Sequence, residues 1–452
     1  MTILIGILAV VFVLGIAINI HEFGHFAVAK LLGMRVDAYS FFGLGPRIWG
    51  FKVGHTDYRI SAIPLGAYVK LYGDEATGPL EGEDNQGEVV PQSELYELRP
   101  RWQKFLVMIG GPFMNIMLAL AIPFGLALYN GVPAAPSPII ASVKADGAAE
   151  RAGAQVGDRI VVFDGVENPT WQRIQNDSML TPEKEIPVVV ERAGQRIPLT
   201  VSPTRYVQDG NNLGSLDLEP EGDVEPVVVE VAQEGMPAAA AGLQKGDLIV
   251  SFNGAPVRNR TEARQKIIDN GANPIKLTVN RNGEAREIVA NAKIEEGKPP
   301  VLGVQFSNQF GAREKVNVGQ AAAFAWNSNI EILRMTGKAF GQVSKGERSA
   351  GETFSGPIGI VQIISQIANS AGFEGLLFIL GLISLNLGIF NLLPIPMLDG
   401  GQIMMLAIEG FLALFGLTLS MAVKEKIQMV GLAAILLLMV FTIFNDISRF
   451  FR

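Results

Sequence analysis

The sequence predicts a polytopic α-helical membrane protein with about four transmembrane helices and two α/β domains inserted between the second and third spans. Three observations lead to this fold class: four long apolar segments, a region of ordinary soluble composition between the second and the third, and a repeat inside that region. The composition agrees. Hydrophobic residues make up 48% of the 452 residues and charged residues only 18%, against about 25% charged residues in ordinary soluble domains.

Charge and cysteine content exclude several classes of function. With 37 basic and 44 acidic residues the net charge is -7, whereas a nucleic-acid-binding protein shows a basic footprint. The chain has no cysteine, which excludes disulfides, thiolate zinc sites, iron-sulfur clusters and cysteine nucleophiles. Any transition metal must therefore be held by the three histidines and by carboxylates.

Four segments meet the criterion of roughly 20 apolar residues for a membrane-spanning helix: residues 2–20, 105–129, 376–398 and 427–444. A secretory signal peptide is the competing interpretation of the first segment, which carries no charge. However, no basic residue precedes it and no small-x-small cleavage site follows it, so we expect an uncleaved helix.

A fifth apolar stretch, residues 403–421, contains Glu409 and several glycines. We expect an interfacial or half-inserted helix there, because a full span would reverse the side on which the later residues lie. Lys424 and Lys426 precede the fourth span and give a weak positive-inside signal for the orientation.

The soluble region contains two copies of one sequence pattern. Its two blocks read AERAGAQVGDRIVVFDG and AAAAGLQKGDLIVSFNG, and each combines a short helix, a glycine turn, a strand and an Asp-Gly or Asn-Gly turn. Six positions recur 89 residues later: Gly153, Gly157, Asp158, Asp164, Gly165 and Gly194 match Gly242, Gly246, Asp247, Asn253, Gly254 and Gly283. The spacing predicts two small domains, at 131–220 and 221–310.

Both copies resemble PDZ domains of the kind found in bacterial proteases. PDZ domains bind extended peptides by adding a strand to the edge of a sheet, so peptide binding is one expected role. The competing interpretation is that the two domains serve only as spacers or lids.

The first apolar segment leads into His21-Glu22-Phe23-Gly24-His25, which is an HExxH motif. On a helix this spacing places both imidazoles on one face, one turn apart. Two neutral imidazoles can share one zinc ion, while Glu22 lies near enough to accept a proton from the attacking water. The alternative, satisfied core or interfacial histidines, is unfavourable because polar residues at membrane depth are energetically expensive without a functional reason.

A tetrahedral catalytic zinc needs a third protein ligand and keeps its fourth position for water. His55 lies in the polar stretch VGHTDYR, outside the first span. Asp399 lies in NLLPIPMLDGG after the third span, where Pro394 and Pro396 must end the helix. The first and third spans cross the membrane in the same direction, so Asp399 and His25 lie on the same side, and parity favours Asp399.

HEFGH, GPFMN at 111–115, the tandem PDZ pattern and NLLPIPMLDGG together resemble the site-2 protease family of intramembrane zinc metalloproteases, in its bacterial tandem-PDZ form. The resemblance implies one Zn²⁺ held by His21, His25 and Asp399, with Glu22 as the general base. It further implies that five residues shape the active site, with the first of them near the scissile segment: Asn391, Pro394, Pro396, Gly111 and Asn115. Gln402 stands where relatives frequently have histidine, at a position that is not a ligand in the family.

The resemblance also implies an activity and a location. It implies regulated intramembrane proteolysis in the bacterial inner membrane, where the enzyme cuts single-span proteins near their cytoplasmic side as part of a stress response. The implied substrates are anti-sigma factors shortened by a first protease, and remnant signal peptides. The PDZ domains would be periplasmic, acting as a size filter or as receptors for peptide tails. A non-enzymatic PDZ scaffold with a structural metal is the alternative from another class, and a zinc transporter is a weaker one.

Residues 58–74, YRISAIPLGAYVKLYGD, alternate well enough to predict a β-hairpin, yet they are apolar for a loop. The resemblance places a membrane re-entrant hairpin here, beside the active site, where it could pair with an unwound substrate strand. Backbone that enters a bilayer must find partners in protein or in a water cavity. An ordinary amphipathic surface hairpin is the competing interpretation.

The remaining segments connect these parts. The Gly/Glu-rich stretch 76–92 predicts a flexible loop. Residues 319–343 have a helical pattern inside a connector at 311–372. This connector would join the PDZ pair to a membrane core whose two halves are residues 1–130 and 373–452.

Overall fold

The computed structural model describes residues 2–63, 66–73, 90–133, 136–208, 211–221, 227–233, 235–257, 260–281, 283–294, 300–306, 313–353 and 356–449. The chain divides into two compact units. The membrane unit comprises Met1–Tyr129 and Asn317–Arg452, and the repeat unit comprises Asn130–Val316.

Four helices of the described chain are long and apolar enough to cross a membrane, as the sequence predicted. They are α1 (Thr2–Leu31), α2 (Arg101–Asn130), α10 (Gly372–Asn391) and α12 (Met421–Arg449). Helix α1 is longer than the apolar segment suggested, because no helix breaker separates that segment from the HExxH motif and the helix continues to Leu31.

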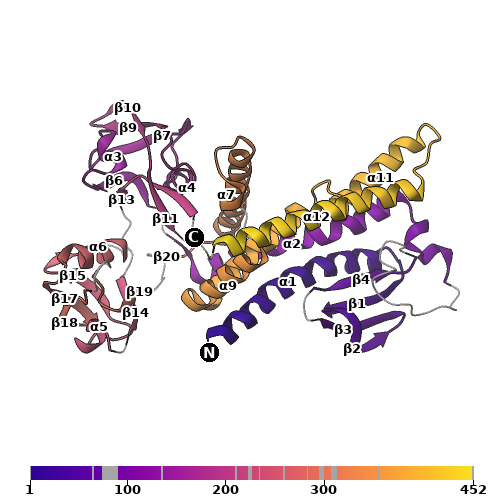
Figure 1. Cartoon of the computed structure of the whole chain (residues 1–452), viewed down its shortest axis with the longest axis horizontal. Coiled ribbons are helices and arrows are strands. Elements are labelled where there is room, and N and C mark those ends of the chain that lie inside the picture. The colour runs from indigo at the N-terminus through magenta and orange to yellow at the C-terminus, as the bar shows by residue number, and fades with distance from the viewer. Residues whose placement is uncertain are drawn as a thin grey trace. The chain divides into compact units, whose positions relative to one another are not determined.

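Helix α1 packs against α9 (Pro357–Ser370), which lies beside it in Figure 1, and against α10. Both helices come more than 300 residues later in the chain. Val13, Ala17 and Ile364 are fully buried in this contact. The core of the membrane unit therefore joins the two halves of the sequence that flank the repeat unit.

Shorter helices complete the membrane unit. Helix α7 (Val318–Ser344) corresponds to the helical pattern at 319–343 in the connector. It begins with a capping box between Asn317 and Gln320. Helix α11 (Asp399–Ala413) has 15 residues, about 22 Å of helix, which is short of a bilayer core of about 30 Å. The other short helices are α8 (Ala350–Thr353), η2 (Gln92–Glu94) and η3 (Tyr96–Leu98).

The start of α9 is fastened to α12 by one buried carboxylate. Asp446 is 3% exposed. Its Oδ1 accepts a hydrogen bond from the backbone N–H of Gly356 and its Oδ2 from that of Gly359, each at 2.9 Å. These are amide groups that a helix N-terminus leaves without an internal acceptor, so α12 supplies the cap of α9.

After α1 the chain forms a four-stranded sheet in the order β2-β3-β1-β4. Its strands are β1 (Val36–Phe42), β2 (Leu44–Val53), β3 (Thr56–Ile63) and β4 (Tyr68–Leu71). The prediction of a hairpin at 58–74 is wrong, because β1 lies between β3 and β4, parallel to the first and antiparallel to the second. Five successive residues of β1 are buried. A strand with this burial is more stable in the middle of the sheet than at its edge. Alternation identifies a strand but not its partner.

The hairpin that does form joins β2 and β3. Strand β2 exposes large apolar side chains, with Ile48 68%, Trp49 61% and Val53 58% exposed. Large apolar side chains with this exposure are expected to contact lipid or protein. Most of the predicted loop at 76–92 lies outside the described residues.

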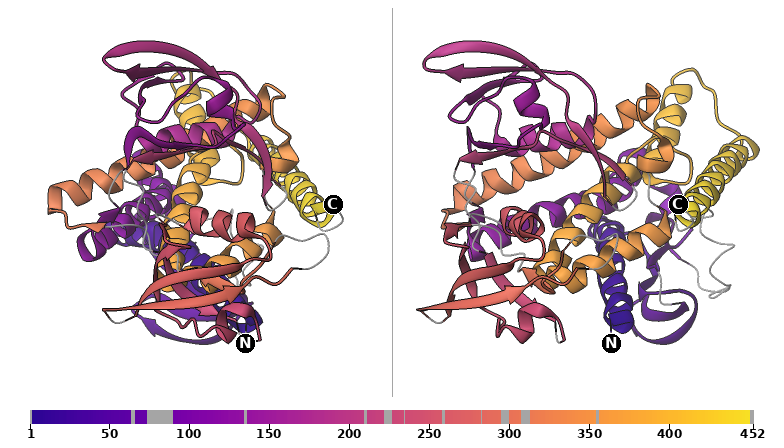
Figure 2. Two further views of the ribbon diagram at one scale, coloured as in Figure 1. Left: turned by 90° about the vertical axis from the view of Figure 1, so that its left-hand side faces the viewer. Right: turned by 60° about the vertical axis from the view of Figure 1, so that its left-hand side comes forward.

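The repeat unit contains two domains with the same strand order, in keeping with the sequence repeat. Figure 2 draws their ribbons in two further views. The first has the order β10-β9-β7-β6-β13, and the second has the order β18-β17-β15-β14-β19. The elements of the first domain are β6 (Ser137–Val143), α3 (Ala148–Arg151), β7 (Arg159–Phe163), β8 (Val166–Glu167), α4 (Trp171–Leu180), β9 (Ile186–Arg192), β10 (Gln195–Val201) and β13 (Leu218–Glu221). Those of the second are β14 (Val227–Ala232), α5 (Pro237–Ala240), β15 (Leu248–Phe252), β16 (Ala255–Pro256), α6 (Arg260–Asn270), β17 (Pro274–Arg281), β18 (Glu284–Asn291) and β19 (Val304–Phe306).

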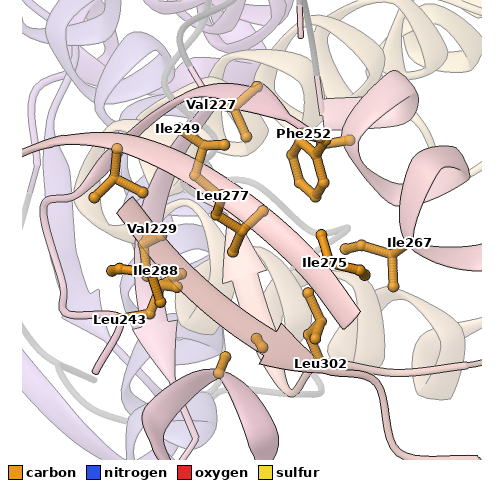
Figure 3. Close-up of a cluster of buried hydrophobic side chains, with 14 residues drawn as sticks. Val227, Val229, Leu243, Ile249, Phe252, Ile267, Ile275, Leu277, Ile288 and Leu302 are labelled. Atoms are coloured by element: carbon orange, nitrogen blue, oxygen red, sulfur yellow. The ribbon is translucent and has the colours of Figure 1, made fainter. Parts of the chain in front are cut away.

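Each domain has its own apolar core. In the second domain Val229, Ile275 and Leu277 are fully buried between the sheet and the helices (Figure 3). The first domain adds a hairpin of β11 (Thr204–Gln208) and β12 (Asn211–Ser215), and β5 (Val132–Pro133) pairs with β20 (Arg313–Glu314).

A buried ion pair also repeats. Asp158 is 0% exposed and accepts hydrogen bonds from Arg192 Nε at 2.6 Å and from Nη2 at 2.7 Å. Asp247, likewise 0% exposed, accepts hydrogen bonds from Arg281 at the same two distances. The two arginines are also 89 residues apart, so the fork-shaped pair belongs to the repeated fold.

Candidate metal centre

The HExxH motif lies within α1, and its helical geometry sets the positions of both imidazoles. The ring centroids of His21 and His25 are 4.9 Å apart. The side chains are 8% and 12% exposed, so both rings face the interior of the membrane unit rather than its surface.

Asp399 reaches the imidazoles because the chain folds back sharply after α10. The helix ends at Asn391, and Pro394 and Pro396 lack the N–H groups needed to continue it. A Cβ atom on Gly400 would collide with the carbonyl group of Leu392. Only glycine fits there, and the close approach brings Asp399, the first residue of α11, back toward the end of α10.

The ligand atoms of three residues meet at the spacing of a tetrahedral metal site. His21 Nε2 lies 3.2 Å from His25 Nε2 and 3.1 Å from Asp399 Oδ2, and His25 Nε2 lies 3.5 Å from Asp399 Oδ1. Zinc–ligand bonds of about 2.0–2.1 Å in a tetrahedron separate the ligand atoms by about 3.3 Å. These residues therefore fit a zinc ion in both donor type and spacing.

The tautomer of His25 strengthens this fit. Its Nδ1 lies 2.7 Å from the carbonyl oxygen of Val107, which can only accept a hydrogen bond. In the neutral ring Nδ1 thus carries the proton and Nε2 keeps its lone pair. That lone pair points toward the carboxylate of Asp399, and a cation between them removes the repulsion.

His55 takes no part in this cluster. It lies in the exposed turn between β2 and β3, and the group of potential ligands among the described residues consists of His21, His25 and Asp399. The structure therefore places Asp399, and not His55, beside the two imidazoles, as the parity argument expected.

Glycines allow α2 to cross α1 directly at the site. A Cβ atom on Gly24 would collide with the carbonyl oxygen of Gly110, and one on Gly111 would collide with His25 Nε2. The backbone of α2 consequently lies against both imidazoles. Gly111, predicted as an active-site residue, leaves the space that the two rings occupy.

The donor atoms open onto a cavity of about 300 Å³. Glu22 and Asn391 line it from α1 and α10, and Tyr68, Val69 and Leu71 line it from β4. Asn391 Nδ2 lies 3.2 Å from His21 Nε2, and the backbone of Val69 lies within hydrogen-bonding reach of Glu22. The cavity is thus lined by the three candidate metal ligands, by a carboxylate outside that set and by one edge of the sheet.

The other predicted site residues differ in their distance from the cluster. Asn115 Nδ2 lies 3.4 Å from His21 Nδ1. Pro396 contacts α12, since a Cβ atom on Gly431 would meet its side chain and its carbonyl group. Pro394 is exposed in the loop before Asp399. The sequence reasoning missed Val107, because any residue type supplies a carbonyl oxygen and the sequence gives no sign of its use.

Comparisons with known proteins agree with this geometry. The model of Peptidase family M50 matches residues 9–438. The chain belongs to peptidase family M50. As a member of this zinc metalloprotease family, it joins a catalytic metal motif to several membrane spans.

Several M50 relatives are similar over nearly the whole chain. The regulator of sigma-E protease RseP of Salmonella typhimurium is 30% identical, with 99% of this chain and 100% of that protein covered. RseP of Escherichia coli is 30% identical over 96% of this chain and 97% of its own. A putative zinc metalloprotease of Vibrio cholerae is 29% identical, with 99% of both chains covered.

A solved structure also matches part of the chain. The PDZ domain of an SdrC-like protein from Listeria monocytogenes is 20% identical with a TM-score of 0.17, and the match covers 18% of this chain and 87% of that one.

Proposed function

We propose that this protein is a zinc endopeptidase that hydrolyses peptide bonds within the transmembrane segments of single-span proteins. The observation that carries the proposal is the convergence of His21, His25 and Asp399 at tetrahedral spacing, on helices that are apolar enough to cross a membrane. Three described ligands leave one coordination position for water or substrate, which is typical of catalytic zinc sites. A structural site, as in a scaffold, would use a fourth protein ligand.

The residues divide into ligands and a base. His21, His25 and Asp399 would hold one Zn²⁺. When bound, zinc polarises the scissile carbonyl and makes water a better nucleophile. Glu22 lines the same cavity but lies outside the ligand set. It would take the proton of the attacking water and pass it to the leaving amine.

Strand β4 offers a place for the substrate backbone. It forms one edge of the four-stranded sheet, and three of its four residues line the cavity. A transmembrane helix hides its carbonyls in its own hydrogen bonds, so the scissile segment must unwind before attack. An unwound segment can recover those hydrogen bonds by pairing with β4.

The proposed substrate class is suggested by the relatives, several of which are named regulator of sigma-E protease or protease RseP. We infer that the substrates are an anti-sigma factor after a first cut, and remnant signal peptides. We place the chain in the bacterial inner membrane, with the repeat unit in the periplasm and the metal centre toward the cytoplasmic side. The two PDZ-like domains would exclude substrates whose periplasmic part is still bulky.

Cleavage by the purified protein tests the proposal. A labelled single-span substrate is incubated with the full chain in detergent micelles, with and without a zinc chelator, and with zinc added back. We expect cleavage within the membrane segment, loss with the chelator and recovery with zinc. Cleavage that persists in chelator, or that occurs only outside the membrane segment, would contradict it.

A further inference from the structure

Both candidate zinc-binding imidazoles direct their second ring nitrogen at helix α2. For His25 the partner is the carbonyl oxygen of Val107, which fixes the proton on Nδ1. For His21 the partner is the side-chain amide of Asn115, 3.4 Å from Nδ1. Asn115 comes eight residues after Val107 on the same helix, about two turns away. One face of α2 therefore meets both rings.

The amide of Asn115 is buried and only partly satisfied. The residue is 0% exposed, and its Oδ1 has no hydrogen-bond partner among the residues that the structure describes. The Nδ2 group, a donor, faces His21 Nδ1. A zinc ligand that binds through Nε2 carries its proton on Nδ1, so this orientation sets two donors against each other.

Exchanging the amide oxygen and nitrogen gives the oxygen a donor and removes the opposition of two donors at His21. The two atoms are nearly equal in shape, and their assignment follows from the hydrogen bonds that they make. With the amide turned over, Oδ1 takes the place of Nδ2 and accepts the proton of His21 Nδ1. The unsatisfied buried oxygen then has a donor, and His21 Nε2 keeps its lone pair for the metal.

The surroundings hold Asn115 in this position. Ser384 on α10 is fully buried and donates a hydrogen bond to the backbone carbonyl of Asn115 at 3.0 Å. A Cβ atom on Gly388, one turn along α10, would press against the Cβ atom of Asn115. Helix α10 thus fixes the backbone on one side, while the side chain extends toward His21.

We propose that Asn115 is a positioning residue whose amide oxygen holds the Nδ1 proton of His21 and so keeps Nε2 available for zinc. The inference rests on the metal centre proposed above. Outer partners of this kind typically contribute 10–100-fold to metal affinity.

Zinc affinity of the full chain in micelles tests the role, measured by competition with a chromophoric chelator. Asn115→Leu, of similar volume, removes the acceptor and should weaken zinc binding by about 10–100-fold. Asn115→Asp supplies an oxygen that can only accept, and should bind zinc within about threefold of the wild type. In protein labelled with ¹⁵N-histidine, the zinc-bound wild type and the Asp variant should show a protonated Nδ1 on His21.

Asn329 provides a matched control. It is a buried asparagine of the same unit that donates hydrogen bonds to the carbonyl oxygens of Ala119 on α2 and Ala325 on α7. Asn329→Leu deletes a buried amide of the same size, away from the imidazoles, and should leave zinc affinity unchanged.

Each other outcome overturns a defined part of the inference. Wild-type affinity in Asn115→Leu would refute the role of Asn115. An Asp variant as weak as the Leu variant would refute the acceptor role, and an equal loss in Asn329→Leu would show a general packing effect instead. A wild-type chain that binds no zinc, or binds it equally well without His21, would refute the metal centre itself.

Discussion

The paired aspartates of the repeat unit differ from Asp399 of the membrane unit in the partners that face them. In the repeat unit, Asp158 and Asp247 each face the fork of an arginine, so their charge is neutralised within the fold. In the membrane unit, Asp399 faces two imidazoles whose lone pairs converge with its own. A buried charge needs a compensating partner. An arginine partner supplied by the chain indicates a structural role, whereas a carboxylate grouped with two imidazole lone pairs forms a donor set suited to a metal.

This contrast predicts the largest effect at Glu22, the carboxylate that lines the cavity outside the ligand set. Glu22→Gln keeps the size of the side chain but cannot take a proton, so cleavage should fall by about 10²–10⁴-fold. The zinc content should stay near one ion per chain, because the three ligands remain. Rate measurements with a single-span substrate, together with metal analysis, check both halves. Turnover like that of the wild type would reject the assigned base.

A second prediction separates the ligand from the histidine outside the cluster. Asp399→Ala should lose both zinc and activity, because two imidazoles alone bind the ion weakly. His55→Ala, in an exposed turn, should keep both. Metal analysis of the two purified variants decides between them, and the reverse result would move the third ligand to His55.

A third prediction concerns the repeat unit as a whole. If its charges serve only its own fold, deleting residues 131–310 should leave zinc bound and the trimmed substrate still cleaved. If the repeat unit acts as a size filter, the deletion should also allow cleavage of an untrimmed substrate. A folded, zinc-loaded deletion protein that still rejects the untrimmed form would refute the filter. Loss of cleavage of the trimmed form would favour a tail receptor.

A smaller effect is expected from breaking one of the repeated ion pairs. Asp158→Asn leaves Arg192 without its counter-charge and should destabilise the first domain by about 1–3 kcal/mol. Hydrogen–deuterium exchange of the full chain measures this domain by domain. Exchange should rise in the first domain while the second, with Asp247 intact, serves as the internal control. Asp247→Asn should give the mirror image. Equal changes in both domains would contradict the assignment of each pair to its own fold.

The same ion pairs predict that the stability of the two domains depends modestly on pH. Burial raises the pKa of Asp158, but the hydrogen bonds from Arg192 and from the backbone of Gln155 outweigh it and hold the pKa below its usual value. The pKa of Asp247 is lowered in the same way by Arg281. A carboxyl with a lowered folded-state pKa stabilises the fold above its unfolded value of about 3.9, and this contribution is lost as pH falls toward the folded value.

Exchange measured between about pH 5 and pH 2 should therefore reveal progressive loosening of both domains. In Asp158→Asn the first domain should lose its share of this acid response, while the second keeps it. A variant whose first domain responds to acid just as the wild type does would contradict this account.

Sequence reasoning reached the features that depend on neighbours along the chain. The four spans, the 89-residue repeat and the placement of His21 and His25 follow from local periodicity, and Asp399 followed from the direction of two spans. The pairing of β1 between β3 and β4 did not, because alternation in one strand carries no information about its partner. Arg192 and Arg281 also recur at the repeat spacing. Their pairing with Asp158 and Asp247 could not be predicted, because it depends on contacts between residues far apart in the sequence. The hydrogen bond from His25 to the carbonyl oxygen of Val107 could not be predicted, because every residue type carries such an oxygen.

The cap that α12 gives to α9 has a consequence for biosynthesis. The amides of Gly356 and Gly359 are translated about 90 residues before the carboxylate of Asp446 that accepts their hydrogen bonds. Until α12 is inserted, the start of α9 must be solvated by other groups or remain outside the hydrocarbon. Because α9 also packs against α1, the membrane unit can take its final packing only after α12 has entered the bilayer. The helix packing around the candidate metal ligands is therefore complete only once α12 has joined α9.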